Sequence, residues 1–383
     1  MGKLKELRIV FTKGVDVFSP GDIVKGEVNL QVEDEAGRGL ENVKGVWVRF
    51  NGEATIKRSG DSSQSYRMME EGYFDTTQIL FGTGTETPDV HNLNIPPGKK
   101  CFPFTIRLPS DSLPAAFEGQ YGYVRYGVKA TVSLIRSIKN KDYKTFKYFS
   151  VIGPPVDLNG IDGLKTPMTS DSISRGWLGL GAPVATISMS LPKQGYVPGE
   201  SINVTGRVDN RGRDDRISIR VKFIQEIHFL FRKSVASVEN VLAKIESQVV
   251  CPRGRVSNFT VGPLRVPPVP PSGLPGCNII DIEYFILCKD RKFPLTIGTV
   301  PLRRAAQGRR RNPRAATGPM GSAAESAGRP GSDDAPPSYA EAVGVTDRIA
   351  YEINRDDYFG DDHFLPRYPY FERMGNLAFC SSR

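Results

Sequence analysis

The chain has 383 residues, of which 39% are hydrophobic and 24% are charged, and it carries a formal net charge of +9 at pH 7. This composition can fill one or two ordinary hydrophobic cores, which excludes a wholly disordered or collagen-like protein. The first residues pass from charged side chains directly into an alternating pattern, and nowhere do about 18 apolar residues follow one another. We therefore expect a soluble, intracellular protein without a signal peptide.

The cysteines are five in number and include no CxxC pair: Cys101, Cys251, Cys277, Cys288 and Cys380. An odd number without paired spacing is typical of free or buried thiols in a reducing compartment. We therefore expect no disulfide bonds and a cytoplasmic location.

Short strands separated by turns are predicted in the first part of the chain. Apolar side chains alternate there, as at Val46, Val48 and Phe50, with the period of a half-buried strand. Turn signals such as SPGD at residues 19–22 recur between these runs, and helical periodicity is nearly absent. This pattern predicts a β-sandwich over residues 1–155.

The same alternation returns later in the chain. Residues 156–182 are predicted to be a hinge or linker, and Ile217, Ile219 and Val221 then alternate with polar side chains. We expect a second sandwich over residues 183–302, so the predicted fold class is all-β with two tandem immunoglobulin-like β-sandwiches.

An internal duplication supports this organisation more strongly than the strand count does. VFSPGDIVKGEV at residues 17–28 is echoed by GYVPGESINVTGRV at residues 195–208. Both strings keep a turn in which proline fixes one backbone angle and glycine permits a positive one. Further echoes follow in the same order: VWVRF from Val46 and IRVKF from Ile219, FPFTIRL from Phe102 and FTVGPLR from Phe259, YVRYGVKATV from Tyr123 and IDIEYFILC from Ile280.

The remaining residues, 303–383, are predicted to be a disordered tail that is first basic and then acidic and aromatic. Its arginine cluster includes Arg309, Arg310 and Arg311. A solvated linker is the first interpretation, contact with an anionic membrane surface the second, and nuclear targeting or nucleic-acid contact the third. Binding of nucleic acid would require aromatic residues interleaved with the basic ones, and this cluster lacks them. We therefore expect no nucleic-acid partner.

The tail also contains the string PPSY. Pro336 and Pro337 favour the polyproline II conformation, which exists before binding, and Tyr339 supplies a ring for a neighbouring pocket. This PPxY spacing is the ligand pattern of WW domains, the modules by which HECT-type ubiquitin ligases find their targets. A chance match in a proline-rich loop is the alternative.

A second, degenerate motif of the form LPxY follows at Leu365, Pro366 and Tyr368. It is a candidate for a weaker WW-domain site, and two working motifs would engage tandem WW domains with avidity. The alternative is that this aromatic-rich segment packs back on the body of the protein or is simply solvated.

Enzymatic functions have little support in the sequence. The three histidines, His91, His228 and His363, are isolated, and the chain has no GxSxG elbow, no phosphate-binding glycine loop and no paired Cys/His spacing for zinc. We expect no catalytic residue, no cofactor and no metal site. A structural or adhesion sandwich would need a signal peptide and an even number of cysteines.

Several strings together resemble the alpha-arrestins, the arrestin-domain-containing proteins: PGDIVKGEV, FPFTIRLPSDSLPAAFEGQYGYVRYGVKA, the VDLNG junction, the second PGE and GRV, and a PPxY tail. The resemblance implies two arrestin-type sandwiches and an adaptor for ubiquitin-dependent endocytosis and sorting. Its body would engage receptors or transporters as cargo at the plasma membrane and endosomes, while Pro336, Pro337 and Tyr339 would recruit the ligase. The alternative is a signalling scaffold that binds membrane or nucleic acid through the arginine cluster. The PSAP or PTAP motif of some relatives is missing, and thioredoxin binding, a property of one branch of the family, cannot be transferred to any cysteine.

Overall fold

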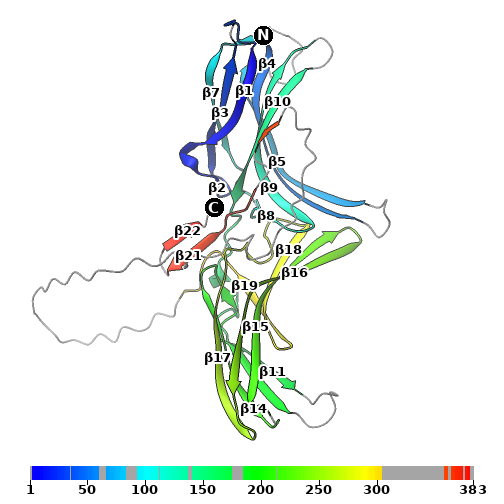
Figure 1. The fold of residues 1–383 in the computed structure, drawn as a ribbon, viewed down its shortest axis with the longest axis vertical. Coiled ribbons are helices and arrows are strands. Elements are labelled where there is room, and N and C mark those ends of the chain that lie inside the picture. Colours follow the sequence, from blue (N-terminus) through cyan, green and yellow to red (C-terminus); the bar gives the residue numbers. More distant parts are fainter. Residues whose placement is uncertain are drawn as a thin grey trace, which may run out of the picture.

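Two β-sandwiches lie end to end along the long axis of the molecule in the computed structural model (Figure 1). The structure describes residues 2–34, 36–59, 66–82, 93–111, 113–136, 140–174, 184–212, 214–303, 358–360, 364–373 and 376–379. Within these ranges the only helical segments are two short 3-10 turns, η1 (Thr12–Gly14) and η2 (Leu158–Gly160). No helix in the described residues is long and apolar enough to cross a membrane. The all-β class with two tandem sandwiches is confirmed.

The first sandwich packs a three-stranded sheet against a larger one. The small sheet has the order β1 (Lys3–Phe11), β3 (Ile23–Glu33), β7 (Gly98–Arg107). The large sheet has the order β2 (Val17–Phe18), β10 (Lys141–Val151), β9 (Gly122–Leu134), β4 (Leu40–Ser59), β5 (Tyr66–Gly82), with β6 (Leu93–Ile95) beside β4 and β8 (Phe117–Glu118) beside β9.

The second sandwich is built in the same way. One sheet has the order β11 (Met168–Ser174), β12 (Ala185–Leu191), β14 (Ser201–Asn210), β17 (Arg255–Arg265). The other has the order β13 (Gly195–Tyr196), β19 (Arg291–Ile297), β18 (Ile280–Cys288), β15 (Arg216–Phe231), β16 (Ser234–Val250).

The duplication seen in the sequence is a duplication of topology. The order β2-β10-β9-β4-β5 corresponds strand for strand to β13-β19-β18-β15-β16, and β1-β3-β7 corresponds to β12-β14-β17. The matched strings fall on matched strands, with VWVRF in β4 and IRVKF in β15. Both repeated turns also place glycine at a positive φ, +82° at Gly21 and +95° at Gly199. The strand patterns therefore encode the same unit twice.

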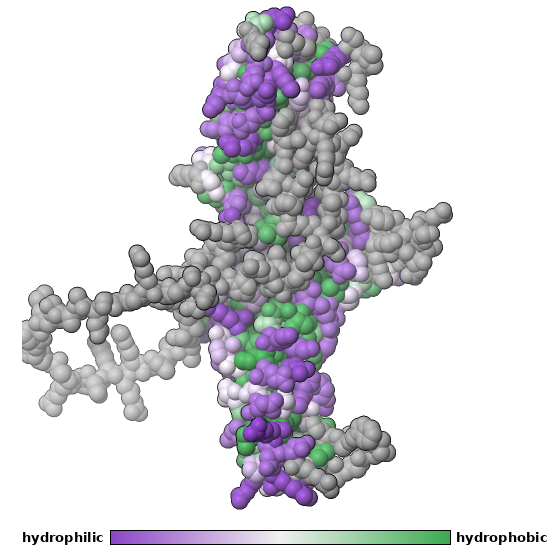
Figure 2. All heavy atoms as spheres, viewed as in Figure 1, coloured by the Kyte–Doolittle hydropathy of each residue, from purple (hydrophilic) through white to green (hydrophobic). Residues whose placement is uncertain are grey.

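Alternation of side chains fills the core of each sandwich. In β3, buried and exposed residues alternate along the strand, and Val24, Val28 and Val32 are at most 1% exposed. Because successive side chains of a strand point to opposite faces, one face of each sheet lines the core and the other meets water. On the side of the molecule shown in Figure 2, hydrophilic residues accordingly cover much of the described surface of both sandwiches.

One part of the predicted hinge is instead a strand. Residues 168–174 form β11, which pairs antiparallel with β12 at the edge of the second sandwich. Its sequence, MTSDSIS, is mostly polar because an edge strand has only one neighbour and much contact with water, so it lacks the apolar alternation that marks a strand.

The two sandwiches meet along a line that we call the seam. Tyr121 of the first sandwich contacts Phe229 of the second edge to face, with ring centroids 5.7 Å apart. Glu71 in β5 accepts hydrogen bonds from the backbone and side-chain N–H groups of Asn278, at 2.9 and 2.8 Å. Direct contacts therefore supplement the chain connection between the sandwiches.

Three described pieces of the tail also form strands, where disorder was expected. They are β20 (Tyr358–Gly360), which pairs parallel with β10, and the hairpin of β21 (Pro369–Arg373) and β22 (Asn376–Phe379). Figure 1 shows this hairpin at the waist of the molecule, between the two sandwiches. The physical reason is the aromatic content of this stretch, since large rings favour strands and burial.

Candidate functional site

Most of the predicted binding residues lie outside the described part of the chain. These are Pro336, Pro337, Tyr339, Arg309, Arg310 and Arg311. The second candidate motif is described. Its three residues, Leu365, Pro366 and Tyr368, belong to a segment that we call the clasp, residues 364–371, which lies along the seam.

Tyr368 is the most deeply placed residue of the motif. Its side chain is 1% exposed, and its hydroxyl donates a hydrogen bond to the backbone carbonyl of Ala116 at 2.9 Å. Pro366 is buried and Leu365 is half-buried. The sequence left open whether this segment packs on the body of the protein or is solvated. In the structure it packs on the body.

Arg367 fastens the clasp to the first sandwich. Its guanidinium Nη1 lies 2.9 Å from the Oδ1 atom of Asp16, and its backbone N–H donates to the hydroxyl of Ser150 at 3.0 Å. Phe364 adds a ring contact with Tyr148 at a centroid distance of 5.3 Å. The charged pair is about one-third exposed, so solvent screens it and the buried ring of Tyr368 is the stronger anchor.

The other end of the clasp contacts the second sandwich. The N–H of Phe371 donates to the carbonyl of Pro198 at 3.1 Å, and its side chain packs against the cluster formed by Leu158, Leu164 and Val197. Tyr370 is fully buried and lies under the guanidinium of Arg265, 5.5 Å from the ring centroid. The clasp therefore spans both sandwiches.

Gly199 allows this close approach. A Cβ atom at Gly199 would lie 2.2 Å from the carbonyl oxygen of Phe371, which is an overlap, and the positive φ also disfavours other residues. At the duplicated position, Gly21, the nearest atom to such a Cβ would be 3.7 Å away, in Ser110. The two turns are alike in backbone conformation, but only the second is covered by the clasp.

The partners of the clasp could not be found from the sequence. Asp16, Ser150 and Ala116 precede it by more than 200 residues and lie in ordinary strand or loop contexts. The density of rings in FLPRYPYF was the one available signal, and it indicated burial without indicating where.

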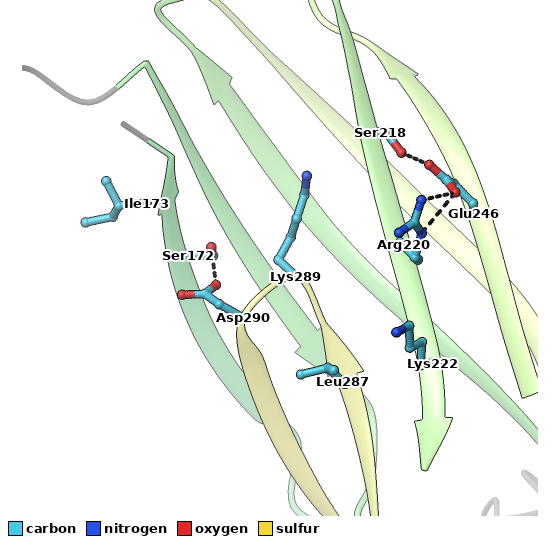
Figure 3. Close-up of a pocket in the computed structure, with 9 residues that line it drawn as sticks. All are labelled: Ser172, Ile173, Ser218, Arg220, Lys222, Glu246, Leu287, Lys289 and Asp290. Atoms are coloured by element: carbon cyan, nitrogen blue, oxygen red, sulfur yellow. Dashed lines mark hydrogen bonds and ion pairs between the residues drawn. The ribbon is translucent and has the colours of Figure 1, made fainter. Parts of the chain in front are cut away.

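A second feature is an open pocket of about 590 Å³ in the second sandwich (Figure 3). Arg220 and Ser218 both bond the Glu246 carboxylate, and these contacts hold its pKa below the usual range, with the Ser218 hydrogen bond as the largest cause. Ser172 donates to the neighbouring Asp290 on one side of the pocket and lowers the pKa of that carboxyl in the same way. The polar groups of this pocket thus bind mainly one another.

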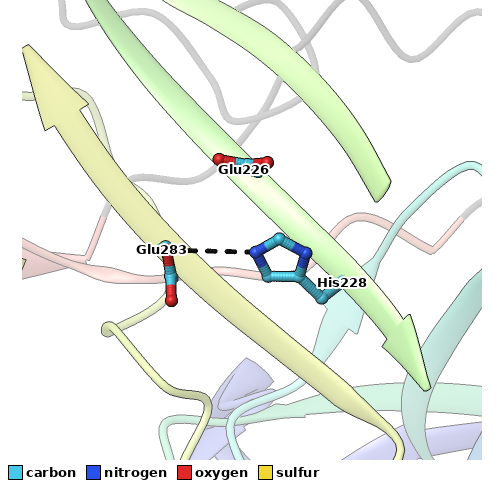
Figure 4. Close-up of side chains that lie close together, drawn as sticks. All are labelled: Glu226, His228 and Glu283. Carbon is cyan, nitrogen blue, oxygen red and sulfur yellow. Dashed lines mark ion pairs between the residues drawn. The ribbon is translucent and has the colours of Figure 1, made fainter. Parts of the chain in front are cut away.

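A third feature brings His228, which looked isolated in the sequence, together with two glutamates. Glu226, His228 and Glu283 have side-chain ligand atoms within 4.8 Å of one another, on the neighbouring strands β15 and β18 (Figure 4). His228 Nδ1 lies 2.9 Å from the Ser237 hydroxyl, and its Nε2 lies 3.9 Å from Glu283. Lys292 lies 3.6 Å from Glu226, so the cluster is a polar network whose groups already face oppositely charged or hydrogen-bonding partners.

Comparison with protein-family models identifies both sandwiches. Residues 7–159 match the model "Arrestin (or S-antigen), N-terminal domain", and residues 184–289 match "Arrestin (or S-antigen), C-terminal domain". The boundary between the two matches falls in the region that connects the sandwiches.

Similar curated proteins carry the same domain names. Arrestin domain-containing protein 1 of Rattus norvegicus is 27% identical over 305 residues, 79% of this chain and 64% of the relative. The Homo sapiens protein of that name is 26% identical, with 75% and 61% covered. Arrestin domain-containing protein 4 of Mus musculus is 28% identical, with 89% and 83% covered. This chain thus spans somewhat less than two-thirds of the length of the first two relatives.

Proposed function

The chain belongs to the arrestin family, among the arrestin-domain-containing alpha-arrestins, and from this premise we propose that it is an adaptor that links membrane cargo to WW-domain ubiquitin ligases. The observation that carries the proposal is the joint presence of two arrestin sandwiches and a PPSY string outside them. In this proposal the body engages a receptor or transporter, and the ligase attaches ubiquitin to the cargo or to the adaptor. The cargo then enters endocytosis and sorting.

The chemistry proposed for the tail is that of a short docking peptide. Pro336 and Pro337 would lie on an aromatic groove with little loss of conformational entropy, and the ring of Tyr339 would fill the neighbouring pocket. The adaptor would act from the cytoplasm and be recruited to the plasma membrane and to endosomes. We propose no catalytic step, because an adaptor acts by holding two other proteins together.

Binding of the purified chain to a recombinant WW domain of a HECT-type ligase tests the proposal by calorimetry. We expect affinity in the micromolar range, about −7 to −8 kcal/mol, and at least a tenfold loss in Tyr339→Ala because the pocket loses its ring. Ser338→Ala, at the variable position of the motif, is the matched control and should retain binding.

The proposed binding of membrane cargo is tested separately in cells. Proximity labelling with wild type and Tyr339→Ala should find the same membrane proteins near both, but ligases near the wild type only. Equal WW-domain affinity of wild type and Tyr339→Ala would contradict ligase docking through this motif, whatever the cargo result.

A further inference from the structure

We propose that Leu365, Pro366 and Tyr368 are a second WW-domain ligand that the seam conceals, so that ligase docking at this motif requires the clasp to leave both sandwiches. The inference rests on the proposed function for its partner class, a WW domain. It adds a regulatory property: the first motif would recruit one WW domain, and the second would engage only after the clasp is released.

The Tyr368 ring is buried in the structure, and this burial excludes simultaneous binding to a WW domain. A WW domain takes up the tyrosine side chain of its ligand in a pocket of its own, but the ring of Tyr368 is 1% exposed and its hydroxyl is already bonded to Ala116. Pro366 is buried as well. The same side chains cannot occupy the seam and a WW domain together, so the two arrangements exclude each other.

Release of the motif would change more than one contact. Tyr368 and Arg367 bind the first sandwich, and three residues further on Phe371 binds Pro198 of the second. A WW domain that pulls Tyr368 from the seam therefore works against contacts that join the two sandwiches. By thermodynamic linkage, whatever shifts the clasp toward its released state strengthens docking at this motif, and docking favours release of the clasp by the same factor.

The size of the effect follows from the population of the released clasp. When only a fraction of molecules is binding-competent, the apparent Kd rises by the inverse of that fraction. A clasp released in one molecule in ten gives a tenfold weaker site. Engagement of tandem WW domains through both motifs would then be conditional on release.

The first experiment compares the motif with and without the seam. A peptide of residues 360–373 is titrated with a WW domain of a HECT-type ligase, and so is the full chain carrying Tyr339→Ala, which removes the first motif. We expect the peptide to bind at least tenfold more tightly than the chain. A peptide that does not bind, or a chain that binds as tightly as the peptide, overturns the inference.

The second experiment releases the clasp within the folded chain by Gly199→Ala, whose Cβ overlaps the Phe371 carbonyl. Gly21→Ala is the matched control, because that turn has a similar positive φ but no clasp against it. In the Tyr339→Ala background, Gly199→Ala should strengthen WW binding at least fivefold and Gly21→Ala should not. Equal affinities of these two variants overturn the inference.

A second pair of variants, with smaller structural changes, tests the same inference in case the glycine variants misfold. Asp16→Asn removes the ion pair with Arg367, whereas Asp75→Asn removes an exposed ion pair with Arg49, between β5 and β4, that does not include a residue of the clasp. Asp16→Asn should raise both WW affinity and the rate of trypsin cleavage after Arg367, measured by mass spectrometry, and Asp75→Asn should raise neither. Faster cleavage without stronger WW binding overturns the inference.

These outcomes are separable from failure of the proposed function. Docking through the first motif is measured by Tyr339→Ala in a chain with the clasp intact. Masking of the second motif is measured in chains that already lack Tyr339. Either result can therefore fail while the other holds.

Discussion

At the scale of single residues, the largest cause of the lowered pKa of Asp290 is a hydrogen bond from Ser172. The Ser172 hydroxyl in β11 donates to this carboxylate, which lies in the turn between β18 and β19, and the bond lowers the pKa of Asp290 below its usual value of 3.8. Ser172 is 5% exposed although it belongs to an edge strand. This bond ties β11 to the opposite sheet of its sandwich.

Ser172→Ala should raise the pKa of Asp290 toward 3.8, as measured by NMR titration of its side-chain carboxyl carbon. Because the folded-state pKa is depressed, the stabilisation from this bond is present above pH 3.8 and is lost as the pH falls through the folded-state pKa. The variant should therefore lose stability relative to wild type at neutral pH, and the difference should shrink below pH 3.8.

Ser218→Ala provides the control for this prediction, because Ser218 bonds Glu246 in the same pocket. It should shift the pKa of Glu246 and leave that of Asp290 unchanged. An Asp290 titration that is identical in wild type and Ser172→Ala would contradict the assignment.

At the scale of elements, equivalent strands of the two sandwiches have equivalent core residues. Phe50 in β4 and Phe223 in β15 occupy the same place in the duplicated strings, and both are fully buried. Phe50 contacts Phe104 at a centroid distance of 5.4 Å, and Phe223 stacks on Tyr284 at 5.8 Å. Each ring therefore fills the core of its own sandwich.

Phe50→Ala and Phe223→Ala should each lower the free energy of unfolding by about 3–5 kcal/mol through lost burial and a residual cavity. Hydrogen exchange should show which sandwich each substitution destabilises. We expect faster exchange in β1–β10 for Phe50→Ala and in β11–β19 for Phe223→Ala. Val241→Ala, at a 46% exposed position of β16, should change stability by less than about 0.5 kcal/mol. Uniform acceleration across both sandwiches for either phenylalanine variant would contradict the assignment of each ring to the interior of its own sandwich.

Elements with strong alternation were predictable from the sequence, and weakly patterned elements were not. The anchors at Val46 and Ile219 were matched correctly because a strand buried on one face must repeat its apolar residues with period two. β11 was missed because its polar sequence meets water over much of its length. β20 was missed because its pairing partner, β10, is remote in sequence, and no local period encodes a remote partner.

At the scale of the whole molecule, the contacts that join the sandwiches include the ring pair of Tyr121 and Phe229, the bonds between Glu71 and Asn278, and the clasp. The first two are independent of the tail. They should hold the sandwiches together when the clasp is released.

Tyr121→Ala combined with Glu71→Ala should loosen the seam, because the ring pair with Phe229 and both hydrogen bonds from Asn278 are then lost. Small-angle X-ray scattering should show an increased radius of gyration relative to wild type. Val256→Ala, at a 45% exposed position in β17 away from the seam, is the control and should scatter like wild type. An unchanged radius of gyration in the double variant would show that other contacts hold the seam.

The sequence by itself determined that this chain has an all-β fold, a duplicated sandwich and a tail with the PPSY string, because alternation, turn chemistry and short linear motifs are local properties. Only the tertiary structure decided the fate of the second motif. LPRY at residues 365–368 has the same local form wherever it lies, but whether its tyrosine is accessible depends on Asp16, Ala116 and Ser150, which folding alone brings to it. Burial is a property of all the neighbours in space, and local sequence patterns do not contain them.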